Sequence, residues 1–289
     1  MDPALVRLYL TTFLFSLLMG IGLPLVPQHL GLTFHASLGF IGVVMGLHGL
    51  MQMVLRLPLG DMADRRGRKL SLLLSFLLTA AAGVFYAAAP SARWIVPGHM
   101  LFGLASGIYW VAANSYLFDR VTPEQVPRAT SDYALSLGAA LLIGPPLAGW
   151  VADAWGFRAA LGLFIWVSLA GLALVATLPE VRPDPSRARP PGGVVRRAAR
   201  ILRHPDIAVS AAGTFLFSLL FGTLAAFFPV YLRALSYTAL VVGVLFALRQ
   251  GAGLAVRVRL PAAIERFGPR AVLVAGILVA SAATALLPL

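Results

Sequence analysis

Long apolar runs divide the chain, and short polar or turn-forming stretches separate them. Each run approaches or exceeds the about 20 apolar residues that a helix needs to cross a bilayer. The runs cover roughly residues 6–27, 37–59, 70–89, 93–117, 130–152, 157–178, 206–232, 238–258 and 270–288. The pattern therefore predicts an all-α membrane protein with nine transmembrane helices.

The longest separator, 179–205, begins with prolines and glycines and continues with a run of arginines. Its second part, from Val194 to Arg203, predicts a short basic amphipathic helix on the membrane surface. A solvated arginine-rich linker is the alternative for the same residues. We take this separator as a cytoplasmic linker between an N-terminal six-helix bundle, 1–178, and the first three helices of a C-terminal bundle, 206–289.

The chain also repeats itself. Residues 12–20 recur as 214–222 with eight of nine positions identical. An offset of 201 residues then pairs further positions in the two halves, namely Gly42 with Gly243, Leu47 with Leu248, Arg56 with Arg257, Leu59 with Leu260 and Gly67 with Gly268. Parallel repeats of about six helices are typical of one class of secondary transporter.

Composition agrees with a membrane protein. The chain is 59% hydrophobic and 12% charged, with a mean hydropathy of +0.86, which excludes a soluble enzyme and a disordered chain. With the N-terminus placed in the cytoplasm, eighteen of the 23 Lys and Arg residues fall on the inner side. The net charge of +12 is thus a topology signal and does not indicate nucleic acid. We expect a multi-pass protein of the inner (plasma) membrane.

Metal and thiol chemistry have no basis in the sequence. There are no cysteines, and the five histidines are scattered without metal-ligand spacing. No span carries a nucleophile motif or a histidine–acid cluster. We therefore expect neither a metal, nor a cofactor, nor an enzyme.

One loop carries a specific motif. Residues 60–69, here called the signature loop, read Gly-Asp-Met-Ala-Asp-Arg-Arg-Gly-Arg-Lys. This resembles the Gly-x-Leu-Ala-Asp-Arg-x-Gly-Arg-Lys loop of the major facilitator superfamily, with Met62 in the leucine position. The resemblance implies a gating loop whose Asp64 and Arg68 form a charge network with Asp119 at the inner ends of the helices. Its remaining motif residues are Gly60, Arg65 and Gly67.

A second motif lies in the fifth span. Gly144-Pro145-Pro146-Leu147-Ala148-Gly149 is similar to the Gly-Pro-x-x-Gly-Gly motif of drug and sugar efflux members of this superfamily. A proline kink between small residues allows helices to approach closely across a bundle interface. We expect Gly144, Pro145 and Gly149 to form such a kinked interface.

Polar residues inside the spans are candidates for a substrate cavity, because such groups are unfavourable in lipid. His48 and Gln52 share one face of the second span, and Arg249 occupies the matching position of the repeat. Tyr109, Asn114 and Gln250 are further candidates. Two alternatives are open: His48 could instead bond a neighbouring backbone, and Arg249 could pair with a helix-end carbonyl.

Proton coupling has no obvious carboxylate, because none of the eleven acids lies at mid-span. Histidine titrates near neutral pH, so His48 or His99 could carry a proton. This would make the protein an antiporter.

We predict a secondary active transporter that moves a small organic solute by alternating access, as a monomer in the lipid bilayer. Export is favoured over uptake, while the substrate and the coupling ion are open. The alternative is a non-transporting remnant with a structural or regulatory role. The second repeat ends at Leu289, the counterpart of Ala88, so three helices equivalent to about 90–178 are missing. We expect a truncated form of a parent with roughly 390–400 residues, twice the repeat length.

Overall fold

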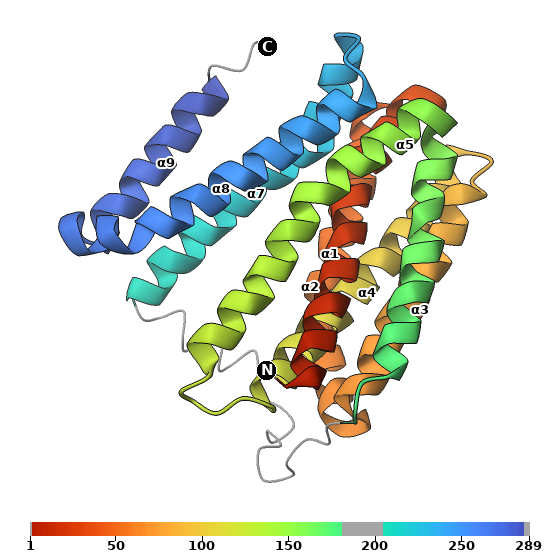
Figure 1. Ribbon diagram of the computed structural model, residues 1–289. Coiled ribbons are helices and arrows are strands. Elements are labelled where there is room, and N and C mark those ends of the chain that lie inside the picture. The colour runs from red at the N-terminus through yellow and green to blue at the C-terminus, as the bar shows by residue number, and fades with distance from the viewer. Residues whose placement is uncertain (1, 181–204, 286–289) are drawn as a thin grey trace. The chain divides into compact units, whose positions relative to one another are not determined.

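The computed structural model describes residues 2–180 and 205–285 (Figure 1). Within four helices it describes only the backbone of some residues, namely 54–66, 205, 206, 257, 258, 261, 284 and 285. The described residues are mostly helical and contain no strand. This confirms the predicted all-α class. The predicted amphipathic helix from Val194 to Arg203 lies outside the described residues.

Every predicted span falls on a helix. The elements are α1 (Pro3–Gln28) with the short π-helical turn η1 (His29–Thr33), α2 (Leu38–Arg66), α3 (Arg68–Ala87), α4 (Ala92–Phe118), α5 (Val126–Ala176), α7 (Pro205–Ala234), α8 (Ala239–Phe267) and α9 (Pro269–Ala285). Six of the described helices are long and apolar enough, by length and composition, to cross a membrane. Two shorter apolar stretches, Leu38–Met53 and Pro269–Ala283, lie in α2 and α9.

Helix α5 consists of two rods that fold back on each other at Gly156 (Figure 1). Gly156 has φ 84° and ψ 164°, a conformation that residues with a Cβ rarely adopt. The two rods correspond to the predicted spans 130–152 and 157–178. Gly156 therefore makes the turn that the sequence pattern placed there.

The predicted repeat reappears in the helix boundaries. An offset of 201 residues carries α2, Leu38–Arg66, onto the bounds of α8, Ala239–Phe267. The residue that follows each of these helices is a glycine with positive φ, 99° at Gly67 and 81° at Gly268. The same backbone turn thus joins α2 to α3 and α8 to α9.

The signature loop is shorter than the sequence suggested. Helix α2 continues through Arg66, so Gly60 lies inside a helix and does not form a turn. Only Gly67 leaves the helical conformation. The apolar pattern ends near residue 59, but a helix can continue as a polar segment once it leaves the apolar region, which explains the difference.

The described chain forms two compact units. The first contains residues 1–189 and 224–250, and the second contains 190–223 and 251–289. In the second unit, Gly213 of α7 lies against Leu273 of α9. Large apolar side chains such as Phe215 and Leu278 are 67% and 64% exposed, as suits a surface that faces lipid.

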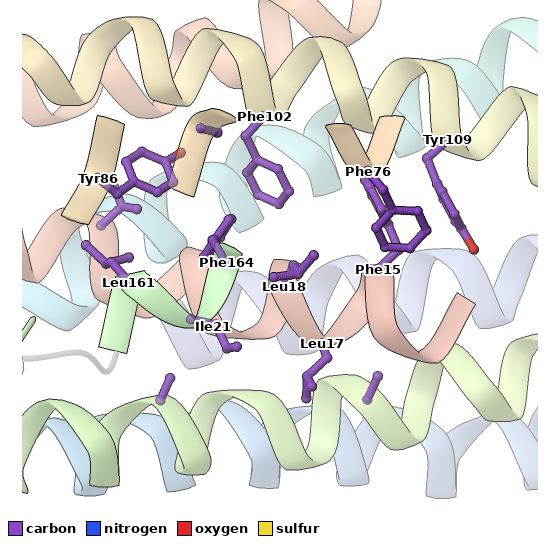
Figure 2. Close-up of a cluster of buried hydrophobic side chains, with 14 of the residues drawn as sticks. Phe15, Leu17, Leu18, Ile21, Phe76, Tyr86, Phe102, Tyr109, Leu161 and Phe164 are labelled. Carbon is purple, nitrogen blue, oxygen red and sulfur yellow. The ribbon is translucent and has the colours of Figure 1, made fainter. Parts of the chain in front are cut away.

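An aromatic cluster fills the centre of the first unit (Figure 2). The rings of Phe15 on α1 and Tyr109 on α4 are stacked, with 3.9 Å between their centroids. Phe76 of α3 meets both rings edge to face. Phe102 and Phe164 continue the cluster towards α5. These contacts join four helices, and aromatic pairs of this geometry contribute about 0.5–1.5 kcal/mol each beyond their burial.

Helices α2 and α4 cross at backbone distance. A Cβ built at Gly103 would lie 2.5 Å from the carbonyl oxygen of His48 and 2.9 Å from its Cα. Gly107, one turn further, faces the backbone of Gln52 in the same way at 3.3 Å. Because the obstacle is backbone, it cannot move aside as a flexible side chain would. The crossing therefore requires glycine on α4.

This crossing predicts the effect of adding one methyl group. Gly103→Ala should lower the unfolding free energy by about 1–3 kcal/mol, the usual range for overpacking, despite the higher helix propensity of alanine. The matched control is Gly46→Ala on α2, where a Cβ would meet nothing within 4 Å. Thermal unfolding of the purified variants measures both. An unchanged melting temperature for Gly103→Ala would contradict the crossing.

Candidate functional site

The signature loop places its charged residues around the junction of α2 and α3. The side chains of Asp64 and Arg65 lie outside those that the structure describes. Arg68 begins α3 and is almost fully buried. Its Nε donates a hydrogen bond to Oδ2 of Asp119, 3.2 Å away, at the end of α4. The structure thus brings together two of the three residues that the resemblance assigned to one charge network.

A second ion pair involves Arg120, the residue that follows Asp119. Arg120 Nε lies 2.9 Å from Oδ2 of Asp2, whose Oδ1 accepts a hydrogen bond from the Ala4 amide and caps α1. The Ala4 amide, together with Arg120, holds the pKa of the Asp2 carboxyl below its usual value. These contacts fix the start of α1 to the loop after α4.

The same end of the first unit also holds the last turn of α5. Lys69 Nζ donates to the carbonyl oxygen of Ala176, and Arg7 donates to that of Thr177, both at 2.7 Å. Cations near a helix C-terminus satisfy carbonyl groups that have no partner in the helix and oppose the negative end of its dipole. The charged residues at this end therefore tie α1, α3, α4 and α5 into one platform.

The two candidate proton carriers, His48 on α2 and His99 on α4, lie together in a buried polar cluster. The rings of His48 and His99 lie 5.2 Å apart between centroids. His99 Nδ1 is hydrogen-bonded to the Tyr86 hydroxyl at 2.8 Å. His48 Nδ1 and His99 Nε2 are buried and have no hydrogen-bond partner among the described residues. Such atoms are uncommon in proteins and call for an explanation.

Other candidates make bonds within the protein. The Tyr109 hydroxyl donates to Thr12 Oγ1 at 3.0 Å, and the side chain is fully buried on Phe15. Asn114 donates to the carbonyl oxygen of Trp110 on its own helix at 2.7 Å.

The last three candidates show different degrees of exposure. Gln52 and Gln250 are half-buried, and Arg249 is exposed. Whether these candidates line a cavity therefore stays a prediction.

The Gly-Pro segment of α5 lies in two helix crossings. A Cβ at Gly144 would lie 3.0 Å from the carbonyl oxygen of Leu17 on α1. A Cβ at Gly243 of α8 would collide with the carbonyl oxygen of Pro145 on α5. A Cβ at Gly149 of α5 would collide with the carbonyl oxygen of Ala239 on α8. The segment therefore packs by backbone contact against a helix of each repeat.

Asp153 is a polar residue that the sequence reasoning missed. Its two carboxylate oxygens accept hydrogen bonds from the amides of Ala239 and Leu240, at 2.9 and 2.8 Å, at the start of α8. In the sequence it stands in a turn-like separator between two spans and belongs to no motif. Only the position of α8 gives it a role.

Comparisons with known proteins agree with this architecture. The sequence profile of the Major Facilitator Superfamily matches residues 8–289. Multidrug resistance protein MdtG of Escherichia coli (strain K12 / DH10B) is 29% identical over 282 residues, which cover 93% of this chain and 67% of that protein. The same protein from Escherichia coli O1:K1 / APEC gives the same values.

Solved structures share the fold at low sequence identity. The crystal structure of nucleoside transporter NupG has a TM-score of 0.73 at 16% identity, over 93% of this chain and 69% of that one. A bacterial homologue of the human lysosomal transporter Spinster has a TM-score of 0.72 at 16% identity. The match covers 93% of this chain and 64% of the homologue's chain. With the profile match over nearly the whole chain, these findings lead to one conclusion: the chain belongs to the Major Facilitator Superfamily and is a multi-pass membrane protein.

Proposed function

We propose that this protein is a secondary active transporter that exports small organic solutes by alternating access. The observation that carries the proposal is the contact between the two repeats. Helix α5 of the first repeat meets α8 of the second at Gly149 and Gly243, where the two backbones come into direct contact. A contact made by glycines presents no side chains of its own that must be pulled apart when two helices separate. The name of the relative MdtG, a multidrug resistance protein, supports export.

In this proposal the N-terminus is cytoplasmic, and the division into 1–178, 179–205 and 206–289 separates two bundles and their linker. The charged platform and the signature loop then lie on the inner side. Cavity-lining roles are proposed for six polar residues, namely His48, Gln52, Tyr109, Asn114, Arg249 and Gln250.

A flux assay tests transport and the role of the signature loop together. The chain, reconstituted into proteoliposomes with an imposed pH gradient, should move ethidium faster than protein-free vesicles do. Asp64→Asn should slow this flux by about tenfold, because it removes a charge that biases one conformational state. Equilibrium binding of ethidium should stay within about threefold, because the loop lies at helix ends.

The control is Asp61→Asn in the same loop, at a variable position of the motif, which should transport like the unmodified chain. Normal flux in Asp64→Asn would contradict the gating role. No flux from the folded unmodified chain would contradict transport and favour the non-transporting alternative.

We further propose that the histidine pair carries the coupling proton. The rings of His48 and His99 lie 5.2 Å apart between centroids at an angle of 44°, and each carries one buried nitrogen without a partner among the described residues. Such a pair can hold one proton or one bridging water. Two full positive charges at this distance would repel strongly in a buried site, so the pair would hold one proton at a time. The Tyr86 hydroxyl fixes the orientation of the His99 ring.

Substitution of either histidine should uncouple transport from the pH gradient. His99→Asn keeps a polar atom near the position of Nδ1 but removes Nε2, and His48→Asn removes the other ring. Each should lower gradient-driven accumulation of ethidium by about tenfold, while exchange of ethidium without a gradient persists. The control is His35→Asn at an exposed position with φ 49°, which asparagine tolerates. Gradient-driven accumulation that survives in both variants would exclude the pair as the carrier.

A further inference from the structure

The start of α8 is held by a carboxylate from α5. Oδ1 of Asp153 accepts from the Ala239 amide at 2.9 Å, and Oδ2 accepts from the Leu240 amide at 2.8 Å. The next amide, that of Val241, bonds Oγ1 of Thr238, the residue that precedes the helix, at 3.3 Å. The first three amides of α8 are therefore all satisfied by side chains, and two of them depend on a residue about 86 positions away in the sequence.

A charged acceptor at this place is strongly stabilised. The amides at a helix N-terminus carry partial positive charge, and hydrogen bonds from them to a carboxylate are stronger than neutral ones. Arg233, in the last turn of α7, adds a second positive group 3.9 Å from Oδ1 of Asp153. Its guanidinium also donates to the carbonyl oxygen of Tyr237 at 2.8 Å. Asp153 thus binds both sides of the turn between α7 and α8.

The turn between α7 and α8 contains a residue in an unfavourable backbone conformation. Ser236 has φ 66°, a left-handed conformation that is unfavourable for a residue with a Cβ. Such a conformation persists only where the surrounding contacts impose it. The bonds from Arg233 and to Asp153 are contacts of this kind.

About one helical turn from these bonds, the backbones of α5 and α8 touch at two glycines, a contact here called the α5–α8 seam. A Cβ at Gly149, one turn before Asp153, would collide with Ala239, and one at Gly243 would collide with Pro145. Glycines present no side chains that must be pulled out of holes when two helices separate. The hydrogen bonds of Asp153 therefore fix the position of α8 against α5, whereas the glycine contacts between the two helices can separate without moving side chains.

We propose that Asp153 is the lock that keeps this end of the α5–α8 seam closed, and that the transport cycle breaks its two bonds when this end opens. The inference rests on the proposed alternating-access function. It assigns the lock to the ends of the helices opposite the charged platform of Arg68 and Asp119. A device at each end would let one side close while the other opens.

A chemical probe can follow the opening, because the chain contains no cysteine. Ala239, the first residue of α8, is buried in the core that also contains Ala148 and Val151 of α5. In the full chain in nanodiscs, Ala239→Cys should react slowly with a polar maleimide. Adding Asp153→Ala should raise the reaction rate about 5- to 30-fold, the shift in population expected from loss of a helix cap. Asp153→Asn keeps an acceptor but loses the charge, so it should give an intermediate rate.

The matched control is Asp132→Ala, the same substitution near the other end of the same rod of α5, which should leave the rate unchanged. The Asp153→Asn variant keeps the test decisive if Asp153→Ala fails to fold. Equal labelling rates in the unmodified background and both Asp153 variants, at unchanged melting temperature, would overturn the lock. Faster labelling without ethidium flux would leave the lock standing and contradict the transport proposal, so the two can fail separately.

Discussion

Helices in this protein approach one another so closely that backbone touches backbone, and the rest of the structure depends on this approach. Inside a bilayer the lipid is as apolar as a leucine side chain, so burial of apolar surface cannot hold helices together as it does in water. Dispersion between closely packed atoms has to replace it. Gly103 against His48, and Gly144 against Leu17, provide that packing inside the first repeat. The aromatic cluster around Phe15 fills the space between α1, α3, α4 and α5 of the same repeat.

Polar side chains add hydrogen bonds and ion pairs between the helices, and these bonds lie at the helix ends. At one end, Arg68, Arg120 and Lys69 bind groups within the first repeat and make a rigid platform. At the other end, Asp153 binds the start of a helix from the second repeat. The first arrangement joins helices of one repeat, whereas the second joins helices of two repeats. In the proposed cycle, the bonds of Asp153 are therefore the ones that separate the repeats when they break.

Much of the fold could be predicted from the sequence, because local patterns determine it. Apolar runs located the helices, and the breaks between them fall at Gly67, Gly156 and Gly268, which have positive φ in the structure. The 201-residue offset anticipated the matching bounds of α2 and α8. The helical continuation of α2 beyond Gly60 was not predicted, because hydropathy marks where the apolar region ends and not where a helix ends.

The site was less predictable, because side-chain partners depend on which helices meet. Arg68 and Asp119 were paired correctly only through the resemblance to a known loop. Tyr109 was expected at a cavity on its polarity, yet in this structure Thr12 satisfies its hydroxyl within the packed core. Asp153 carried no signal, since its partners are backbone amides that every sequence has. Partners of that kind become visible only once α5 and α8 are placed side by side.

The most direct test of the account is the distance between α5 and α8 at their contacting ends. Trp155 and Tyr237 are exposed, and each lies two residues from a member of the Asp153–Ala239 contact. Spin labels on cysteines at these two positions, in the otherwise cysteine-free chain, report that distance by pulsed EPR. We expect a short distance in the resting protein and a second, longer population that grows when ethidium or a pH gradient is supplied. A single distance that stays the same under all these conditions would contradict alternating access at this contact.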